Sequence, residues 1–278
     1  MEAIGALDNT VIVVSGDHGP PGFTHGKCNL YDFGSSVSLA IRWGGGMPGG
    51  RVVDDLVSLP DLAPTFLELA GVAVPATMTA RSLVGLLKSG KSGRVDPERT
   101  AVFIGRERHV EDARAGYLPY PQRAIRTYDH LYIVNFKPDR TPLGDPYRLD
   151  GDNPPTAEEV TENTRVTLPD EDAGPAKAWL VGQRNDPRWK PYFELAYGKR
   201  PREELYDLKT DPFEVKNVAA EPRYAQVRAE LEARLLDELR RTGDPRLIDD
   251  GKFFETPPMA GPVTTENTPA RQAKKKGR

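Results

Sequence analysis

A short apolar run followed by an acid–imidazole pair, within residues 10–32, constrains the fold of this chain more than any other feature. Residues 11–14, VIVV, form an uninterrupted β-branched run. Such a run is typical of a strand buried on both faces in a parallel sheet, although four residues alone do not exclude a buried helix. Asp17, His18 and Gly19 follow at its C-terminal end, where open α/β sheets bind ligands. The pattern predicts an α/β protein with a site loop.

The pair Asp17 and His18 is a candidate for metal binding. A carboxylate and an imidazole both bind divalent ions, although Ca²⁺ prefers all-oxygen ligands. The simpler interpretation is a polar strand end in which Asp17 caps a turn. Pro20, Pro21 and Gly22 exclude regular structure immediately afterwards, so a loop follows the pair.

The loop continues with His25, Gly26, Lys27 and Cys28. The compact ammonium charge of Lys27 on a glycine-containing loop suits an oxyanion such as sulfate or phosphate, and a solvated surface lysine is the alternative. His25 is a second imidazole of the site, a proton donor or an ordinary loop residue. Cys28 has no His or Asn partner at a spacing that indicates a nucleophile, so a buried, inert thiol is expected.

Composition excludes several classes of protein. The 278 residues are 38% hydrophobic, with 26 Gly and 26 Pro, which favours a globular protein with long irregular connections. The net charge of −3 gives no bulk attraction to nucleic acid or to a membrane surface. A single cysteine excludes an internal disulfide framework and a cysteine-rich zinc site. No apolar run reaches the roughly 20 residues that span a bilayer, and residues 1–10 do not resemble a signal peptide.

Hydrophobic periodicity predicts further strands and helices along the chain. The expected strands are residues 37–43, 101–105, 122–128, 130–136 and 204–207, and the expected helices are residues 60–70 and 222–241. The strands at 122–128 and 130–136 form an antiparallel pair, and the helix at 222–241 is expected to lie on that small sheet. Gly71 stands where the residue after a helix C-terminus is commonly glycine.

The chain is expected to divide into two domains and a tail. Residues 1–115 form part of an α/β domain, residues 116–260 a smaller subdomain, and residues 261–278 a disordered basic tail. Within the subdomain, residues 137–201 are charged and proline-rich. We expect them to wrap the surface with short local elements. Their expected packing anchors are the aromatic residues Trp179, Trp189, Tyr192 and Tyr197.

Three segments give the chain a resemblance to the sulfatase family of the alkaline-phosphatase superfamily. They are VSGDHG with GKCNLYD (residues 14–19 and 26–32), SLPDLAPTFLELAGV (58–72) and ELYDLKTDPFEVKNVA (204–219). Their order and spacing resemble the C-terminal portion of that family, over roughly residues 1–245. The resemblance implies part of an alkaline-phosphatase-like sandwich, a mainly parallel sheet with helices, followed by a small antiparallel-sheet-and-helix subdomain.

The resemblance also implies roles for the loop residues. Asp17 and His18 would bind Ca²⁺ as two ligands of a larger site, and Lys27 would contact the sulfate as a catalytic, substrate-binding residue. His25, of the same loop, is a further candidate for substrate binding on the basis of its residue type and position, not of the resemblance. The segments GRERH (105–109) and YPQRAIRTYDHLYIVNFKPDR (120–140) are similar to the heparan N-sulfatase branch. By that likeness Glu107 and His109 would contact a sugar, and the alternative is a salt-bridged cluster at a domain seam.

Other parts of the family pattern are absent from these residues. Sulfatases carry a formylglycine nucleophile in a C/S-x-P-x-R motif, whereas Cys28 is followed by residues 29–32, NLYD. The paired N-terminal aspartates of the calcium site are also missing. We therefore expect a C-terminal fragment without turnover by itself, whose formylglycine comes from an N-terminal part. A separately encoded N-terminal half is one candidate partner. Intact family members are usually periplasmic, secreted or lysosomal.

Three functions follow as hypotheses. The first is hydrolysis of sulfuric esters or sulfamates of sulfated carbohydrates. The second is a phosphoryl-transfer relative, such as a phosphodiesterase or phosphonate hydrolase, which shares the Asp–His strand end. The third is a non-catalytic half that binds sulfated glycans through the basic pocket around Lys27.

Overall fold

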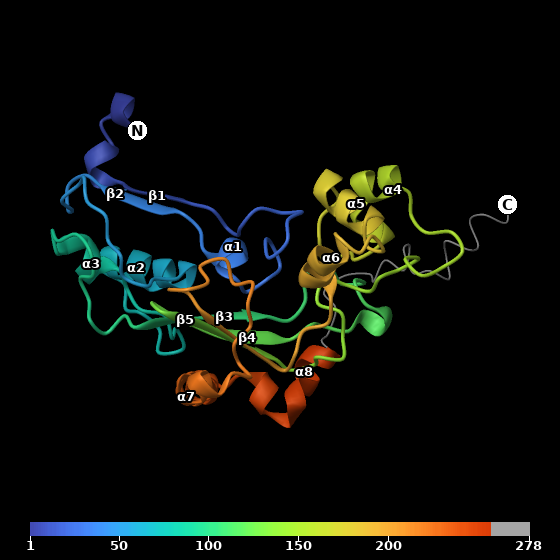
Figure 1. Ribbon diagram of the computed structural model, residues 1–278. Helices are drawn as coiled ribbons and strands as arrows, with labels where there is room; N and C mark the ends of the chain where they lie inside the picture. The colour runs from blue at the N-terminus through green and yellow to red at the C-terminus, as the bar shows by residue number, and fades with distance from the viewer. Residues whose placement is uncertain (257–278) are drawn as a thin grey trace. The chain divides into compact units, whose positions relative to one another are not determined.

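The structure is a computed structural model that describes residues 1–256. It contains a two-stranded and a four-stranded sheet together with short helices (Figure 1). The strands are β1 (Val11–Ser15), β2 (Leu39–Trp43), β3 (Ala101–Arg106), β4 (Gln122–Thr127), β5 (His130–Asn135) and β6 (Glu203–Asp207). The α-helices are α1 (Asp32–Ser35), α2 (Leu62–Leu69), α3 (Val84–Lys88), α4 (Ala157–Glu162), α5 (Pro175–Gly182), α6 (Lys190–Tyr197), α7 (Ala225–Arg241) and α8 (Lys252–Glu255).

The chain divides into two compact units. The first comprises Met1–Asp17, Val37–Val102 and Arg126–Tyr128, and the second comprises His18–Ser36, Phe103–Ile125 and the chain from Asp129 onward. The site loop after β1 thus belongs to the second unit. The expected division at residues 115 and 260 stays a prediction, and the predicted tail at 261–278 lies outside the described residues.

The first unit is built around a small apolar cluster. Leu83, Leu86 and Leu87 of the α3 region are buried in it, and side chains of β2 and α2 pack against them. The helix α2 ends as the sequence predicts, because Gly71 adopts φ 69° and its amide donates to the Glu68 carbonyl at 3.1 Å. The Pro residue expected to delay the start, Pro64, lies buried in the first turn.

The prediction that residues 11–14 are buried on both faces is wrong in this structure. The strand β1 pairs antiparallel with β2, and Val14 is 65% exposed. The β-branched run has the composition of a strand that is buried on both faces. Among residues 1–256, however, β2 is the one strand that pairs with β1. The short apolar run at 101–105, which the sequence also predicts as a buried strand, is only partly buried, since β3 forms an edge of its sheet and Phe103 is exposed.

The four-stranded sheet carries the core of the second unit. Its strand order is β3-β4-β5-β6, and β5 pairs antiparallel with β6 with Tyr132 opposite Leu205. Leu131, Ile133 and Tyr206 are buried in one cluster with Tyr31 of the site loop. The hairpin predicted around Asp129 is confirmed, because β4 ends at Thr127 and β5 starts at His130.

The helix α7 covers this sheet as predicted. Leu231, Leu235 and Leu239 lie on one helical face and are buried, and the helix runs beside β5 (Figure 1). Spacing of four residues places these leucines on one stripe, so the 3.6-residue period alone sufficed to predict the packing face.

Residues 137–201 do more than wrap a surface. The helices α4, α5 and α6 gather into a cluster (Figure 1) with its own core, which includes Val160, Leu168, Val181 and Tyr197. Of the four predicted aromatic anchors, Tyr197 is buried, whereas Trp179 and Tyr192 are exposed. Leucine, valine and alanine side chains fill this core together with Tyr197, and Trp179 and Tyr192 remain at its surface. No helix within residues 1–256 is long and apolar enough to cross a membrane.

Candidate active site around Lys27

The loop that carries Lys27 is a compact double turn. Backbone amides of Gly26 and Lys27 donate to the carbonyls of Phe23 and Pro20 at 2.9 and 3.0 Å. His25 and Cys28, on either side, adopt left-handed φ values of 62° and 71°, which non-glycine residues seldom do. Two uncommon conformations within four residues fix the direction in which Lys27 leaves the backbone.

Glycine is required where the loop meets α1. A Cβ on Gly34 would lie 2.3 Å from the Gly26 carbonyl oxygen, and one on Gly19 would lie 1.9 Å from that of Phe33. Backbone atoms cannot move aside as a flexible side chain can, so any larger residue would displace the loop. The amide of Gly19 uses this close approach to donate to the Gly34 carbonyl at 2.9 Å.

Tyr31 anchors the C-terminal end of the loop in the core of the four-stranded sheet. Its hydroxyl donates to Glu204 Oε2 at 2.7 Å, and Glu204 also accepts hydrogen bonds from Asn135 and Tyr206. The His25 ring stacks on Tyr31 with 3.8 Å between centroids. Because a buried carboxylate needs such partners, this network holds the loop to β5 and β6.

Arg106, at the end of β3, fastens the middle of the loop. Its Nη1 donates to the Cys28 carbonyl at 2.5 Å, and its Nη2 pairs with Asp170 at 2.6 Å. Asp170 also accepts from Arg114 at 2.7 Å and from the Val110 amide at 2.8 Å. Burial alone would raise the pKa of Asp170, but the two guanidinium groups outweigh it and lower the pKa.

Lys27 itself pairs with Asp172, two residues beyond the clamped carboxylate. Its Nζ lies 2.9 Å from Asp172 Oδ2, and the two side chains are 20% and 37% exposed. A partly exposed pair of this kind is held weakly, so an incoming anion can compete for the ammonium.

His109 lies in the same electrostatic neighbourhood. Its side chain is exposed, and the charges that act on it are those of Asp170, Lys27, Arg106 and Asp172. Partial burial, together with the two cations, lowers the pKa of His109 below its ordinary value. The imidazole is therefore largely neutral at pH 7 and offers one donor and one acceptor.

His25 occupies a different environment from the predicted pocket position. Its ring is 5% exposed, and Nε2 has no partner within residues 1–256. Burial and the nearby Arg200 lower the pKa of His25 to about 3. A ring with that pKa is neutral at physiological pH and does not act as a cationic proton donor. The location fits the alternative of a loop residue, and a substrate contact by His25 stays a prediction.

The Cys28 thiol packs against the core of the helical cluster. Burial raises the pKa of the thiol to about 11, in spite of the nearby Arg106 and Lys27. The thiolate, which is the nucleophilic form, is scarce at neutral pH. This environment agrees with the expectation of an inert cysteine.

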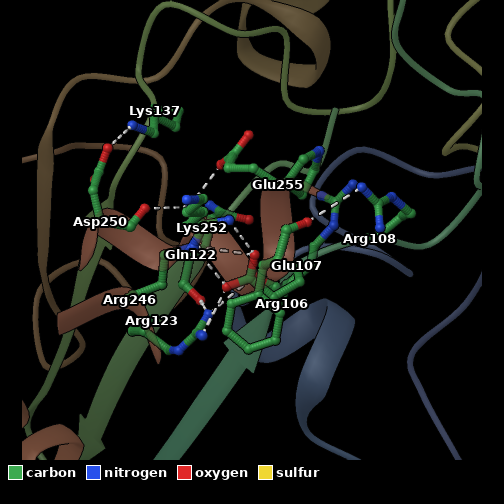
Figure 2. A network of polar contacts seen from close by, with 12 residues as sticks. Arg106, Glu107, Arg108, Gln122, Arg123, Lys137, Arg246, Asp250, Lys252 and Glu255 are labelled. Carbon is green, nitrogen blue, oxygen red and sulfur yellow. Dashed lines mark hydrogen bonds and ion pairs between the residues drawn. The ribbon is translucent and has the colours of Figure 1, made fainter. Parts of the chain in front are cut away.

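Glu107 takes part in an ion-pair network with the C-terminal segment (Figure 2). Its carboxylate accepts from Arg123 at 2.7 Å and from Arg246 at 2.6 Å. Arg246 has no exposed side-chain surface and also reaches Glu255 at 2.7 Å. These contacts correspond to the salt-bridged alternative considered for GRERH, and a sugar contact by Glu107 stays a prediction.

Asp17 and His18 are both exposed where β1 ends. His18 Nδ1 lies 2.8 Å from the Gly19 carbonyl oxygen, which favours the tautomer with a proton on Nδ1. Within residues 1–256 no group of three or more His, Cys, Asp or Glu side chains is arranged to hold a metal ion. Two donors fall short of the six to eight oxygen ligands typical of Ca²⁺, so these residues alone do not make a calcium site.

Sequence reasoning missed Arg106, Arg114, Asp170 and Asp172. Both aspartates lie in a short acidic segment, residues 169–172 (PDED), within the charged, proline-rich stretch 137–201. They contact residues 56 to 145 positions away, and no local spacing encodes such contacts. The one available signal for these ion pairs was the presence of both an acidic run at 169–172 and an arginine-rich segment at 105–114 in the same chain.

Comparisons with known proteins show that this chain is similar to the C-terminal region of sulfatases. The family model for the C-terminal region of N-sulphoglucosamine sulphohydrolase matches residues 19–104. An ulvan-active sulfatase of Formosa agariphila is 27% identical over 237 residues, which is 85% of this chain and 39% of the relative. Human N-sulphoglucosamine sulphohydrolase is 29% identical over an alignment of 261 positions, which covers 87% of this chain and 43% of the relative. The chain thus spans about two-fifths of the length of these relatives.

Solved structures show the same fold. A protein solved with its substrate D-glucosamine-2-N,6-O-disulfate superposes with a TM-score of 0.55 and 21% identity, covering 90% of this chain and 37% of that one. A phosphonate monoester hydrolase of Agrobacterium radiobacter gives a TM-score of 0.54 and 21% identity, covering 87% of this chain and 37% of that one. At these identities the likeness concerns the fold, which agrees with the alkaline-phosphatase-like fold class expected from the sequence.

Proposed function

We propose, given that this chain is related to the C-terminal region of the sulfatase family, that it supplies the sulfate-contacting part of an active site that hydrolyses sulfuric esters or sulfamates of sugars. The observation that supports the proposal is the fixed position of Lys27 on a loop clamped by Arg106 and Asp170. The relatives' names, ulvan-active sulfatase and N-sulphoglucosamine sulphohydrolase, favour a sulfated carbohydrate as substrate.

The charges around Lys27 suit a monoanion. Lys27, Arg106 and Arg114 face Asp170 and Asp172, so three cations stand against two carboxylates and one net positive charge remains. A sulfate ester or a sulfamate carries one negative charge. Because Arg106 and Arg114 are engaged with buried Asp170, the ammonium of Lys27 is the cation available to the ligand.

Lys27 would act by neutralising charge on the sulfate oxygens as the bond from sulfur to the leaving oxygen or nitrogen breaks. A fixed cation at that place stabilises the transition state without reorganisation during the reaction. His109, neutral and exposed in the same neighbourhood, would donate a hydrogen bond to the sugar or to a sulfate oxygen. Both roles are part of the proposal.

The nucleophile and the metal would come with residues beyond those that contact Lys27. No C/S-x-P-x-R motif occurs in residues 1–278, so we propose that these residues alone do not turn over substrate. Asp17 and His18 would supply two ligands of a calcium site that further carboxylates complete. When bound, such an ion would act as a Lewis acid toward the sulfate.

Complementation tests the proposal. Residues 1–278 would be co-expressed with the N-terminal part of a related sulfatase that carries the C/S-x-P-x-R motif, and sulfate release from glucosamine N-sulfate would be measured. We expect release from the pair, none from residues 1–278 alone, and a loss of at least about 100-fold in kcat/KM for Lys27→Ala. Hydrolysis of an aryl sulfate by residues 1–278 alone would contradict the incomplete-site part of the proposal.

Two alternatives remain measurable in the same system. A phosphonate or phosphodiester hydrolase would cleave those esters faster than sulfates, and the structural likeness to a phosphonate monoester hydrolase does not favour it, since 21% identity supports the fold alone. A non-catalytic glycan-binding half would retain sulfated glycan without turnover in any complemented pair. Retention that is unchanged by Lys27→Ala would argue against a binding pocket at Lys27.

A further inference from the structure

Three aromatic rings cluster at the surface of the helical cluster, and we call them the aromatic platform: Trp179 of α5, Trp189 immediately before α6, and Tyr192 of α6. The two indole rings meet edge to face with 4.6 Å between centroids, and Trp189 lies 5.6 Å from Tyr192. Trp179 is 46% exposed and Tyr192 is 53% exposed. Figure 1 shows α5 and α6, which carry Trp179 and Tyr192, within the helical cluster of the second unit.

The rings face outward because the core of the cluster is already filled. On α5 the neighbours Ala178 and Val181 are buried, and on α6 Ala196 and Tyr197 are buried. Trp179 lies on the side of α5 away from Ala178 and Val181, whereas Tyr192 lies one turn before Ala196 in the exposed first turn of α6. Exposed large apolar groups forgo the hydrophobic stabilisation that burial of their side chains would give. Trp189 is half-buried between Trp179 and Tyr192. Packing of residues 1–256 gives no reason for two exposed rings to gather around it at one surface, whereas ligand binding does.

Cations accompany the rings. The guanidinium carbon of Arg188 lies 4.7 Å from the centroid of the Trp189 ring, and Lys190 follows immediately in the chain. Among residues 1–256, neither Arg188 nor Lys190 is engaged in an ion pair with an acidic side chain. Flat, exposed rings suit the apolar faces of sugar rings, and unpaired cations beside them suit sulfate or carboxylate groups on the same sugars.

We propose that the aromatic platform, with Arg188 and Lys190, binds the chain of an anionic, sulfated polysaccharide. The proposal rests on the proposed function for the substrate class but on separate residues for its contacts. Sugar rings stack on Trp179, Trp189 and Tyr192, and the two cations contact sulfates along the chain. A monosaccharide is too short to contact the three rings and both cations together, so the platform favours polymeric over monomeric ligands.

Tryptophan fluorescence tests this proposal directly. The chain contains three tryptophans, and Trp43 is the one outside the platform. In a Trp43→Phe background of residues 1–278, titration with heparin should change the emission of the platform tryptophans in a saturable way. Glucosamine N-sulfate at the same sugar concentration should leave that emission unchanged.

Substitutions then locate the binding. We expect Tyr192→Ala and Trp179→Ala each to raise the heparin dissociation constant about tenfold, as is usual for aromatic residues central to an interface. Arg188→Ala should weaken the binding of heparin more than the binding of chemically desulfated heparin. Phe213→Ala is the matched control, because Phe213 is an aromatic residue that is 81% exposed elsewhere in the second unit. Circular dichroism verifies that each variant folds.

Several outcomes would overturn the platform. One is the absence of a saturable emission change with heparin. Another is an equal heparin affinity of the wild type and Tyr192→Ala. A third is a loss of heparin affinity in Phe213→Ala as large as in the platform variants. Concentration-dependent dimerisation that the platform substitutions abolish would assign the surface to a second copy of the chain and also overturn it. Failure of the proposed function can be distinguished from failure of the platform proposal. In the first case the complemented pair releases no sulfate, while heparin still binds the platform.

Discussion

Arg106 donates a hydrogen bond to the Cys28 carbonyl oxygen at 2.5 Å, and through its other terminal nitrogen it pairs with buried Asp170 at 2.6 Å. One guanidinium thereby joins the site loop to a segment more than 140 residues away in sequence. Asp172, in that same segment, reaches Lys27. The position of Lys27, the proposed sulfate contact, thus depends on a buried ion pair between two other residues.

Replacing Asp170 by Asn should destabilise the protein strongly. Arg106 and Arg114 would remain buried without a counter-charge, which typically costs about 3–5 kcal/mol. Urea denaturation followed by circular dichroism measures the change. Asp172→Asn is the matched control, since its pair with Lys27 is partly exposed and should contribute less than about 1 kcal/mol. Equal effects of the two substitutions would show that Asp170 is not the anchor.

Glu107→Gln distinguishes a structural from a sugar-binding role for that residue. The network in Figure 2 predicts a loss of about 3 kcal/mol in unfolding free energy, because Arg123 and Arg246 lose their shared carboxylate. Lys137→Ala removes an exposed ion pair of the same region and should cost less than about 1 kcal/mol. Unchanged stability of Glu107→Gln together with lost sugar affinity would instead support the contact implied by the family resemblance.

The buried His25 should make stability depend on pH in the acid range. Its pKa is about 3 in the folded protein and 6.5 in the unfolded chain, so between these values the unfolded state binds one more proton. Stability consequently falls as pH drops from 6.5 toward 3, by up to about 1.4 kcal/mol per pH unit from this group. His25→Asn tolerates the left-handed backbone and should reduce that slope. An unaltered slope in the variant would mean that His25 is not responsible.

Cys28 should react slowly with alkylating agents in the folded protein. A pKa near 11 instead of 9.0 reduces the thiolate fraction at pH 8 by about 100-fold. Mass spectrometry after iodoacetamide treatment should show little labelling without denaturant and rapid labelling in urea. Fast labelling of the native protein would reopen the possibility of a reactive thiol.

The sequence predicted the parts of the fold that depend on local periodicity. Leu231, Leu235 and Leu239 identified the buried face of α7, and Gly71 identified the end of α2. It failed where tertiary contacts decide the outcome. Val14 is exposed because a partner for its second face is not among residues 1–256, and Trp179 is exposed because smaller side chains fill the core beneath it.

The candidate site divides along the same line. Lys27 and the glycines around it are visible as a local motif, whereas Asp170 and Asp172 lie in an acidic run whose partners are distant in sequence. The spacing of a local motif can indicate candidate ligand-binding residues. It does not indicate the residues that position them, because the positioning contacts form between segments that are distant in sequence.

Binding of glucosamine N-sulfate to residues 1–278, compared between wild type, Lys27→Ala and Lys190→Ala, tests the central claim most directly. Nuclear magnetic resonance titration at low ionic strength gives the affinity of each protein. We expect measurable binding by wild type, at least tenfold weaker binding by Lys27→Ala, and an unchanged affinity for Lys190→Ala. Equal affinities of wild type and Lys27→Ala would contradict the assignment of Lys27 as the sulfate contact.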